Sequence, residues 1–136
     1  VSDAEKYAAL SISDAFATTS QHEGFGLVFL EAMAFGLPIV CYDRGGQTDF
    51  LASHRTGFVV PLNDEAAFAS AIIELHRDRE SRLRYGHHNR LLVESYFIDT
   101  CARRYEEVYE QVVALRNGVT RTSPPQPTPR SPLSRP

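Results

Sequence analysis

The sequence has 136 residues, enough for one domain or for a piece of a larger one. Its composition, 43% hydrophobic and 23% charged, is ordinary for a globular protein and excludes wholesale disorder. The formal net charge of -3 gives no electrostatic reason to expect nucleic acid or an anionic membrane as a partner.

The ends and the cysteines of the sequence indicate its cellular setting. No stretch approaches the roughly 20 apolar residues that span a bilayer, and the first residues lack the pattern of a signal peptide. Cys41 and Cys101 lie far apart and form no metal-binding or redox pattern. We therefore expect two reduced thiols in a cytoplasmic protein. Because the chain opens at Val1 and not at methionine, we expect a fragment.

The first half alternates predicted helices and strands. A capping-box pattern at Ser2 and Glu5 begins the first helix, and Gly36 and Pro38 end the second. The predicted elements are a helix over 2–10, a strand over 15–18, a helix over 26–35, a strand over 38–42, a short helix over 48–52 and a strand over 56–61. This order predicts a parallel sheet, small for its class, with further strands expected upstream.

The second half is predicted to be helical. The helices cover 62–78, with Asn63 or Asp64 as N-cap, 80–96, weakened by Gly86, and 99–116. Apolar stripes are expected at Phe68, Ile72 and Leu75, and at Tyr105, Val108, Tyr109 and Val112.

Residues 117–136 are rich in proline and serine and show no apolar periodicity. Such a composition buries too little surface to offset its ordering entropy, so this tail is expected to be disordered. Its stretch SPPQPTP, over 123–129, resembles an SH3 ligand, although a solvated terminus is the simpler interpretation. The domain boundaries are thus 1–116 for the folded part and 117–136 for the tail.

Two glutamates stand out in the apolar segment 20–40. Glu31 is the one charged residue of the predicted 26–35 helix, and Glu23 precedes that helix. A glutamate in apolar surroundings needs a partner. Glu31 is therefore a structural group paired with an arginine such as Arg44 or Arg55, or an acceptor for a ligand. Glu23 either complements the helix dipole or belongs to the same ligand site.

The position of these glutamates favours a ligand. GFG, over 24–26, lies between a strand end and a helix N-terminus, where free N–H groups attract anions. Ligands of open parallel sheets bind at this edge. Glu31 lies about 7 Å further along the axis at a rise of 1.5 Å per residue, so the two carboxylates are expected to bracket a phosphate. A sugar nucleotide has hydroxyls on both sides of its phosphates and fits that arrangement.

The segment EGFGLVFLEAMAFGLPIV, over 23–40, resembles the E-x(7)-E signature of retaining glycosyltransferases with the two-domain GT-B architecture, in the glycosyl transferases group 1 (family 4) class. The resemblance extends over about residues 1–113. It implies an α/β fold: a partial Rossmann-like three-layer domain with a parallel sheet, the second half of the C-terminal donor-binding domain, followed by long helices and the tail.

The resemblance also implies roles for individual residues. Glu23 would be catalytic and would contact hydroxyls of the transferred sugar. Backbone amides of the segment 24–27 (Gly24, Phe25, Gly26 and Leu27), with Val28 nearby, would hold sugar hydroxyls and the diphosphate. Glu31 would accept the ribose hydroxyls, and the Gly45–Gly46 pair would form a neighbouring loop.

The implied reaction moves a sugar from a UDP-, GDP- or ADP-sugar to an acceptor hydroxyl with retention, and requires no metal cofactor. Two departures from the family pattern are Thr19 and Asp49, where the family often has proline and glutamate. The family's basic pair for the diphosphate and its acceptor domain lie upstream and are absent from the sequence, so the chain alone is expected to be inactive. Four histidines are expected to be solvated: His54, His76, His87 and His88. His22 precedes Glu23 in the sequence, which does not make the two neighbours in space.

Two alternatives remain open at this stage. A non-catalytic remnant or interaction module would keep the Rossmann-like fold without the chemistry. A nucleotide-sugar epimerase or a phosphorylase on the same architecture is a third interpretation, and the neighbourhood of the motif follows the transferase pattern more closely.

Overall fold

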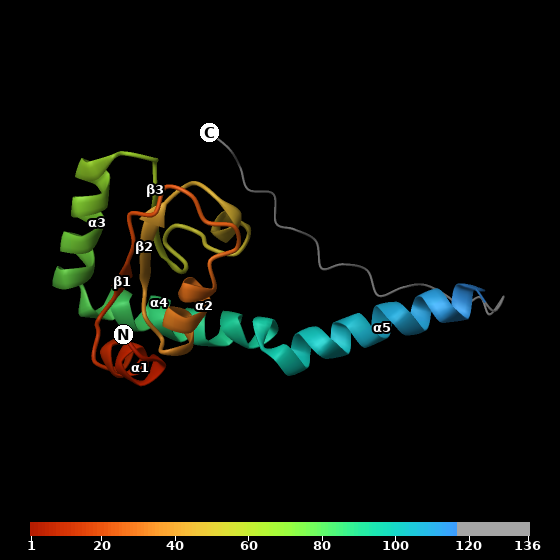
Figure 1. Ribbon diagram of the computed structural model, residues 1–136. Helices are drawn as coiled ribbons and strands as arrows, with labels where there is room; N and C mark the ends of the chain where they lie inside the picture. The colour runs from red at the N-terminus through yellow and green to blue at the C-terminus, as the bar shows by residue number, and fades with distance from the viewer. Residues whose placement is uncertain (117–136) are drawn as a thin grey trace. The chain divides into compact units, whose positions relative to one another are not determined.

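The computed structural model describes residues 1–116, and Figure 1 labels their helices and strands. In chain order the elements are α1 (Asp3–Ser11), β1 (Phe16–Ala17), α2 (Leu27–Ala34), β2 (Ile39–Tyr42), the 3-10 helix η1 (Gly46–Asp49), β3 (Gly57–Val60), α3 (Glu65–Arg77), α4 (Arg79–Val93), the 3-10 helix η2 (Glu94–Tyr96) and α5 (Ile98–Arg116). The chain divides into two units, Val1–Phe97 and a second one that begins at Ile98. The expected tail, with its SPPQPTP stretch, lies outside the described residues.

The first unit is built on a parallel sheet with the order β1-β2-β3. Phe16 pairs with Ile39, and the register between β2 and β3 runs from Ile39 with Gly57 to Tyr42 with Val60. All four residues of β2 are buried, as expected for a central parallel strand covered on both faces. The sequence therefore predicted the parallel sheet and all three strands correctly.

Helices cover both faces of this sheet, which gives three layers (Figure 1). Side chains alternate along β2, so Ile39 and Cys41 pack with Phe29 and Met33 of α2. Val40 and Tyr42 pack on the opposite face with Phe68 and Leu75 of α3. Helix α4 contributes to both clusters, through Val93 to the first and Tyr85 to the second.

The capping predictions agree with the structure. The capping box at the start of α1 is present, with the Glu5 N–H donating to the Ser2 hydroxyl over 3.3 Å and the Ser2 N–H donating to the Glu5 carboxylate over 2.7 Å. The Ser2 N–H and the Ser2 hydroxyl both donate to the Glu5 carboxylate and lower the pKa of that carboxyl. Asp64, the second of the two predicted caps, begins α3 by accepting a hydrogen bond from the Ala67 N–H over 2.9 Å.

Several local predictions were wrong in detail. Ile72 is 43% exposed because the buried face of α3 is centred on Phe68, Ala71 and Leu75, and a rotation of 100° per residue puts Ile72 at its margin. The helix predicted over 48–52 is a 3-10 helix that begins two residues earlier, at Gly46. The Thr48 hydroxyl donates a hydrogen bond to the Gly45 carbonyl at its start. The segment 94–96 of the predicted 80–96 helix is the separate 3-10 helix η2.

Helix α4 continues through Gly86 without a break. Gly86 is buried, and a side chain there would overlap the carbonyl oxygen of Gly36. The glycine therefore lets α4 approach the end of α2 closely, which is a packing reason for a residue of low helix propensity.

Helix α5 forms as expected and belongs to the second unit. The stripe residues Tyr105, Val108, Tyr109 and Val112 are all more than half exposed. No helix in the described part of the chain is long and apolar enough to cross a membrane.

Candidate functional site

Two loops meet at the edge of the sheet where the parallel strands end. The first loop, 18–26, follows β1, and the second, 43–45, follows β2. The Gly46 N–H donates to the Glu23 carbonyl over 2.9 Å. A side chain at position 46 would overlap the carbonyl oxygen of Gly24, so the two backbones touch directly. The expectation that the Gly45–Gly46 loop lies next to the GFG segment is therefore correct.

The N-terminus of α2 opens toward this loop pair without a side-chain cap. Gly26 is the N-cap, with φ 84° and ψ 61°, a left-handed conformation that favours glycine. A side chain at position 26 would also overlap the ring of Phe29, which is fully buried. No side chain accepts the first N–H groups of α2. The Phe29 N–H donates to the Gly26 carbonyl over 3.0 Å, whereas the N–H groups of Leu27 and Val28 have no acceptor within residues 1–116 and can donate to an anion placed there.

Gln47 fixes the second loop, and sequence analysis missed it. Its side chain is only 1% exposed, and its Nε2 donates to the Arg44 carbonyl over 2.6 Å and to the Tyr42 carbonyl over 3.3 Å. Its Oε1 has no hydrogen-bond partner within residues 1–116. An uncharged glutamine after a glycine pair carries no periodicity signal, so only the structure could identify it.

An aromatic cluster holds the first loop from the other side. Phe25, which is 44% exposed, packs against Phe50 and Tyr96 with ring centroids 5.4 and 6.1 Å away. The rings of Phe50 and Tyr96 are 5.5 Å apart. This cluster connects the loop to η1 and η2. The sequence shows these aromatics only as scattered residues, so the cluster was not predicted.

Glu23 is half-buried in the first loop. Its carbonyl is engaged by Gly46, whereas its carboxylate has no hydrogen bond from a side chain within residues 1–116. Leu27, at the start of α2, is 68% exposed and Val28 is half-buried. The segment Glu23–Val28 thus presents backbone and carboxylate groups at the sheet edge, and α2 is less fully buried than its apolar composition suggested.

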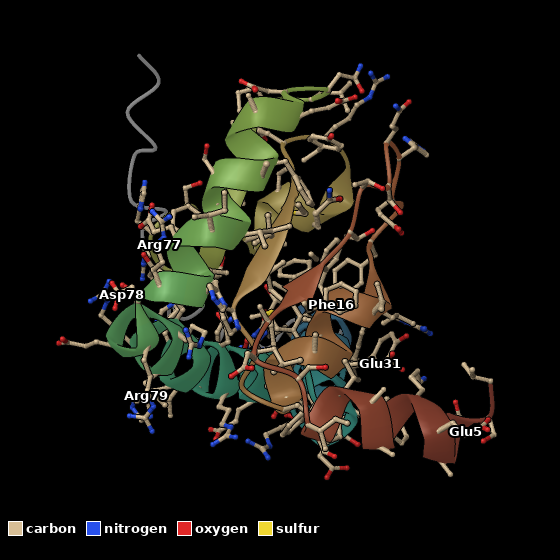
Figure 2. The ribbon with its side chains drawn as sticks, turned by 90° about the vertical axis from the view of Figure 1, so that its left-hand side faces the viewer. Glu5, Phe16, Glu31, Arg77, Asp78 and Arg79 are labelled. Carbon is tan, nitrogen blue, oxygen red and sulfur yellow. The ribbon has the colours of Figure 1, made fainter. Side chains whose placement is uncertain are left out.

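Glu31 has a partner that sequence analysis did not find. Lys6 Nζ of α1 lies 2.7 Å from Glu31 Oε1, and Figure 2 shows Glu31 on α2 beside α1. Neither Arg44 nor Arg55 is the partner. The Glu31 carboxylate raises the pKa of Lys6 above its usual range, with a further contribution from Asp3. The pair joins two helices across 25 sequence positions, a separation that local patterns do not report.

The remaining polar groups indicate no second centre. Within residues 1–116 no group of three or more metal-ligating side chains gathers. Four of the five histidines are exposed, and half-buried His88 has its pKa lowered by burial and by Arg55. Cys41 is buried and free, and burial raises the pKa of its thiol to about 12, which leaves it unreactive at neutral pH.

Comparisons with known proteins give a consistent set of relatives. A family model described as "Glycosyl transferases group 1" matches residues 1–92. The phosphatidyl-myo-inositol mannosyltransferase of Mycobacterium leprae is 36% identical over 113 residues, which is 82% of this chain and 30% of that protein.

Two solved structures resemble the chain. The sucrose-phosphate synthase of Thermosynechococcus elongatus is 31% identical with a TM-score of 0.68, covering 81% of this chain and 27% of that one. Anabaena Alr3699/HepE, solved in complex with UDP, is 22% identical with a TM-score of 0.66, covering 78% of this chain and 29% of that one. These likenesses confirm the expected α/β fold. The chain spans less than a third of the length of each of these relatives.

Proposed function

Because the chain belongs to the glycosyl transferases group 1 family, we propose that it forms the half of a GT-B donor-binding domain that holds a nucleoside-diphosphate sugar. The observation that carries this proposal is the uncapped N-terminus of α2, set against a glycine loop at the edge where the parallel strands end. Open parallel sheets bind their ligands at this edge.

The diphosphate is the part of the donor that fits the start of α2. The first N–H groups of a helix and its dipole together attract negative charge, and the start of α2 has no side-chain cap that competes for them. The left-handed Gly26 and the contact between Gly46 and Glu23 support a fixed loop shape. We assign the diphosphate and sugar hydroxyls to backbone amides of the segment 24–28.

The two glutamates are assigned to the hydroxyl groups on either side of the diphosphate. Glu31 accepts ribose hydroxyls of the nucleotide, and its side chain keeps 29% of its surface exposed although Lys6 holds one oxygen. Glu23 contacts the sugar that is transferred, where its carboxylate orients the anomeric carbon for reaction. Both assignments use a carboxylate as an acceptor, which suits the hydroxyl donors of a sugar nucleotide.

In a complete protein the donor sugar passes to an acceptor hydroxyl with retention at the anomeric carbon. The leaving diphosphate carries the charge that develops, so amides and the dipole at the start of α2 stabilise it more in the transition state than in the ground state. Relatives are more than three times as long as the matched part of this chain. The acceptor site and further cations for the diphosphate belong, in this proposal, to the rest of such a protein.

Calorimetric titration of the chain with UDP, GDP, ADP and their sugar derivatives tests the proposal. We expect one nucleotide class to bind, and Glu31→Gln to weaken it about tenfold or more because a hydrogen bond to a charged group is lost. Glu74→Gln, the same change on the exposed side of α3, is the matched control and should leave affinity unchanged.

Two results would count against the proposal. Binding that is indifferent to Glu31→Gln would remove the ribose assignment. A folded chain that binds none of the nucleotides would favour a non-catalytic interaction module over a donor site.

A further inference from the structure

The partner of Glu31 is an unusual residue for this chain. Lys6 is the only lysine among the 136 residues, whereas the other 13 basic residues are arginines. It comes from α1, a helix that none of the expected site residues belongs to. A contact between Tyr7 of α1 and Phe35 after α2, with ring centroids 5.9 Å apart, holds the two helices together beside the pair.

The ammonium group of Lys6 is held on several sides. It lies 2.7 Å from Glu31 Oε1 and 3.2 Å from Asp3 Oδ1, and 4.7 Å from the ring centroid of Tyr7. Both side chains of the Lys6–Glu31 pair are about 30% exposed, with values of 31% and 29%. The lysine is therefore fixed against α1 and reaches across to the carboxylate, rather than extending freely into solvent.

The pair leaves half of the carboxylate available. Only Oε1 of Glu31 bonds to Lys6, and within residues 1–116 no side chain donates to Oε2. A partly exposed ion pair of this kind contributes about 0–1 kcal/mol to folding, so stability alone gives little reason for it. Restricting the carboxylate before a ligand arrives has a different benefit, because less side-chain entropy is lost on binding.

We infer that Lys6 is a positioning residue of the donor site: it holds Glu31 through Oε1 and so presents Oε2 to the hydroxyl groups of the donor's ribose. The inference rests on the proposed function, since it needs a nucleotide bound near Glu31. It extends the site to α1, which the E-x(7)-E segment does not include. The contrary interpretation is a closed pair, in which Lys6 occupies the carboxylate and competes with the ligand.

A ribose-selective measurement separates these interpretations. Each variant is titrated by calorimetry with whichever of UDP, GDP or ADP the wild type binds best, and with the 2′-deoxy form of the same nucleotide. The wild type should prefer the ribose form about tenfold or more, as expected for one hydrogen bond to a charged acceptor. In Glu31→Gln the ratio of the affinities for the ribose and 2′-deoxy forms should be close to one.

Lys6→Met keeps the length of the side chain and removes its charge. It should reduce the preference for the ribose form over the 2′-deoxy form to about threefold or less, because the carboxylate is no longer held in place. The melting temperature should change little. Lys6→Arg should restore most of the preference. The double variant Lys6→Met/Glu31→Gln should resemble Glu31→Gln alone, because the two residues act as one unit.

Arg79→Met, at the start of α4, is the charge control (Figure 2 labels Arg79). It removes one positive charge without touching Glu31, so it should leave the ribose preference unchanged.

Three results overturn the inference. An unchanged ribose preference in Lys6→Met, alongside its loss in Glu31→Gln, would leave the proposed function standing and remove Lys6 from it. Tighter ribose binding in Lys6→Met would identify a competing pair. Failure of the folded wild type to bind any of the three nucleotides would remove the proposed function and this inference together.

Discussion

The two ends of α2 satisfy their backbone groups in different ways. At the C-terminal end, Gly36 turns the chain with φ 73°, Arg90 donates to the Phe35 carbonyl over 3.0 Å, and Asn89 donates to the Leu37 carbonyl over 2.7 Å. All of these donors come from α4. At the N-terminal end, Gly26 is a cap without a side-chain bond. One end is closed by side chains of α4, and the other has no side-chain cap.

This contrast separates a structural role from a proposed binding role along a single helix. Both ends use glycines for close backbone contact, at Gly86 against Gly36 and at Gly46 against Gly24. At the C-terminal end, Asn89 also donates a buried hydrogen bond to the Leu37 carbonyl, whereas no side chain bonds to the N-terminal end of α2. Changes at the C-terminal end should therefore alter stability and spare binding, whereas changes at the N-terminal end should weaken binding.

The largest effect on stability is expected from Asn89→Ala. Asn89 is fully buried and also donates to the Thr56 carbonyl over 2.9 Å. Its removal leaves the Leu37 carbonyl without this donor and opens a small cavity, which together cost about 2–3 kcal/mol of unfolding free energy. Urea unfolding measures the loss, and His87→Ala, at an exposed neighbour, should stay within about 0.5 kcal/mol of wild type. A loss as small as that of His87→Ala would mean that Asn89 does not close α2.

Gly86→Ala tests whether packing or helix propensity has the larger effect on stability where α4 contacts the end of α2. Propensity favours alanine by about 1 kcal/mol, whereas overlap with the Gly36 carbonyl oxygen costs about 1–3 kcal/mol. We expect net destabilisation of about 1 kcal/mol, or a fall of roughly 4–8 °C in melting temperature. Gly24→Ala, which meets no atom within 4 Å, is the matched stability control. A more stable Gly86→Ala variant would restore the interpretation of Gly86 as a weak point.

Gly46→Ala should weaken binding, which Gly86→Ala should leave intact. Its side chain would push the glycine loop away from the Gly24 carbonyl, so we expect nucleoside-diphosphate affinity to fall about tenfold, equivalent to 1.4 kcal/mol. Calorimetric titration of the folded variant measures this, beside Gly86→Ala as the variant that loses stability and keeps affinity. Equal affinities for Gly46→Ala and wild type would show that the loop contact does not shape the site.

Asp64→Ala is expected to give the smallest effect. The lost cap of α3 costs about 1 kcal/mol of stability, and Asp64→Ser should recover most of it. Thermal unfolding measures both variants. Nucleotide affinity should not change, because the cap stabilises a helix without touching the α2 N-terminus. An affinity loss in Asp64→Ala would link α3 to the site and weaken the comparison between the two ends of α2.

The sequence predicted the features of this site that depend on local patterns. The capping box at Ser2, the helix that follows Gly26 and the strand over 38–42 were each identified from spacing and residue type. The contact between the glycine pair and the GFG segment followed from resemblance to a family, and the backbone bond from Gly46 to Glu23 agrees with it.

Features that depend on contacts between distant elements could not be predicted in this way. Lys6 reaches Glu31 from another helix, Tyr96 reaches Phe25 from beyond α4, and the Gln47 amide holds a loop through backbone carbonyls. The packing of Gly86 against Gly36 was missed for the same reason, since helix propensity describes α4 alone and this contact involves the end of α2.

The most direct test of the contrast between the two ends of α2 is an NMR titration that reports on each residue separately. Amide chemical shifts of the 15N-labelled chain are followed during titration with UDP, GDP and ADP. The account predicts that one nucleotide shifts the amides of the segment 24–28 and those around Gly45 and Gly46, while the amides of Phe35, Gly36 and Leu37 stay in place. Shifts centred on residues 35–37 and α4, with none at residues 24–28, would contradict it.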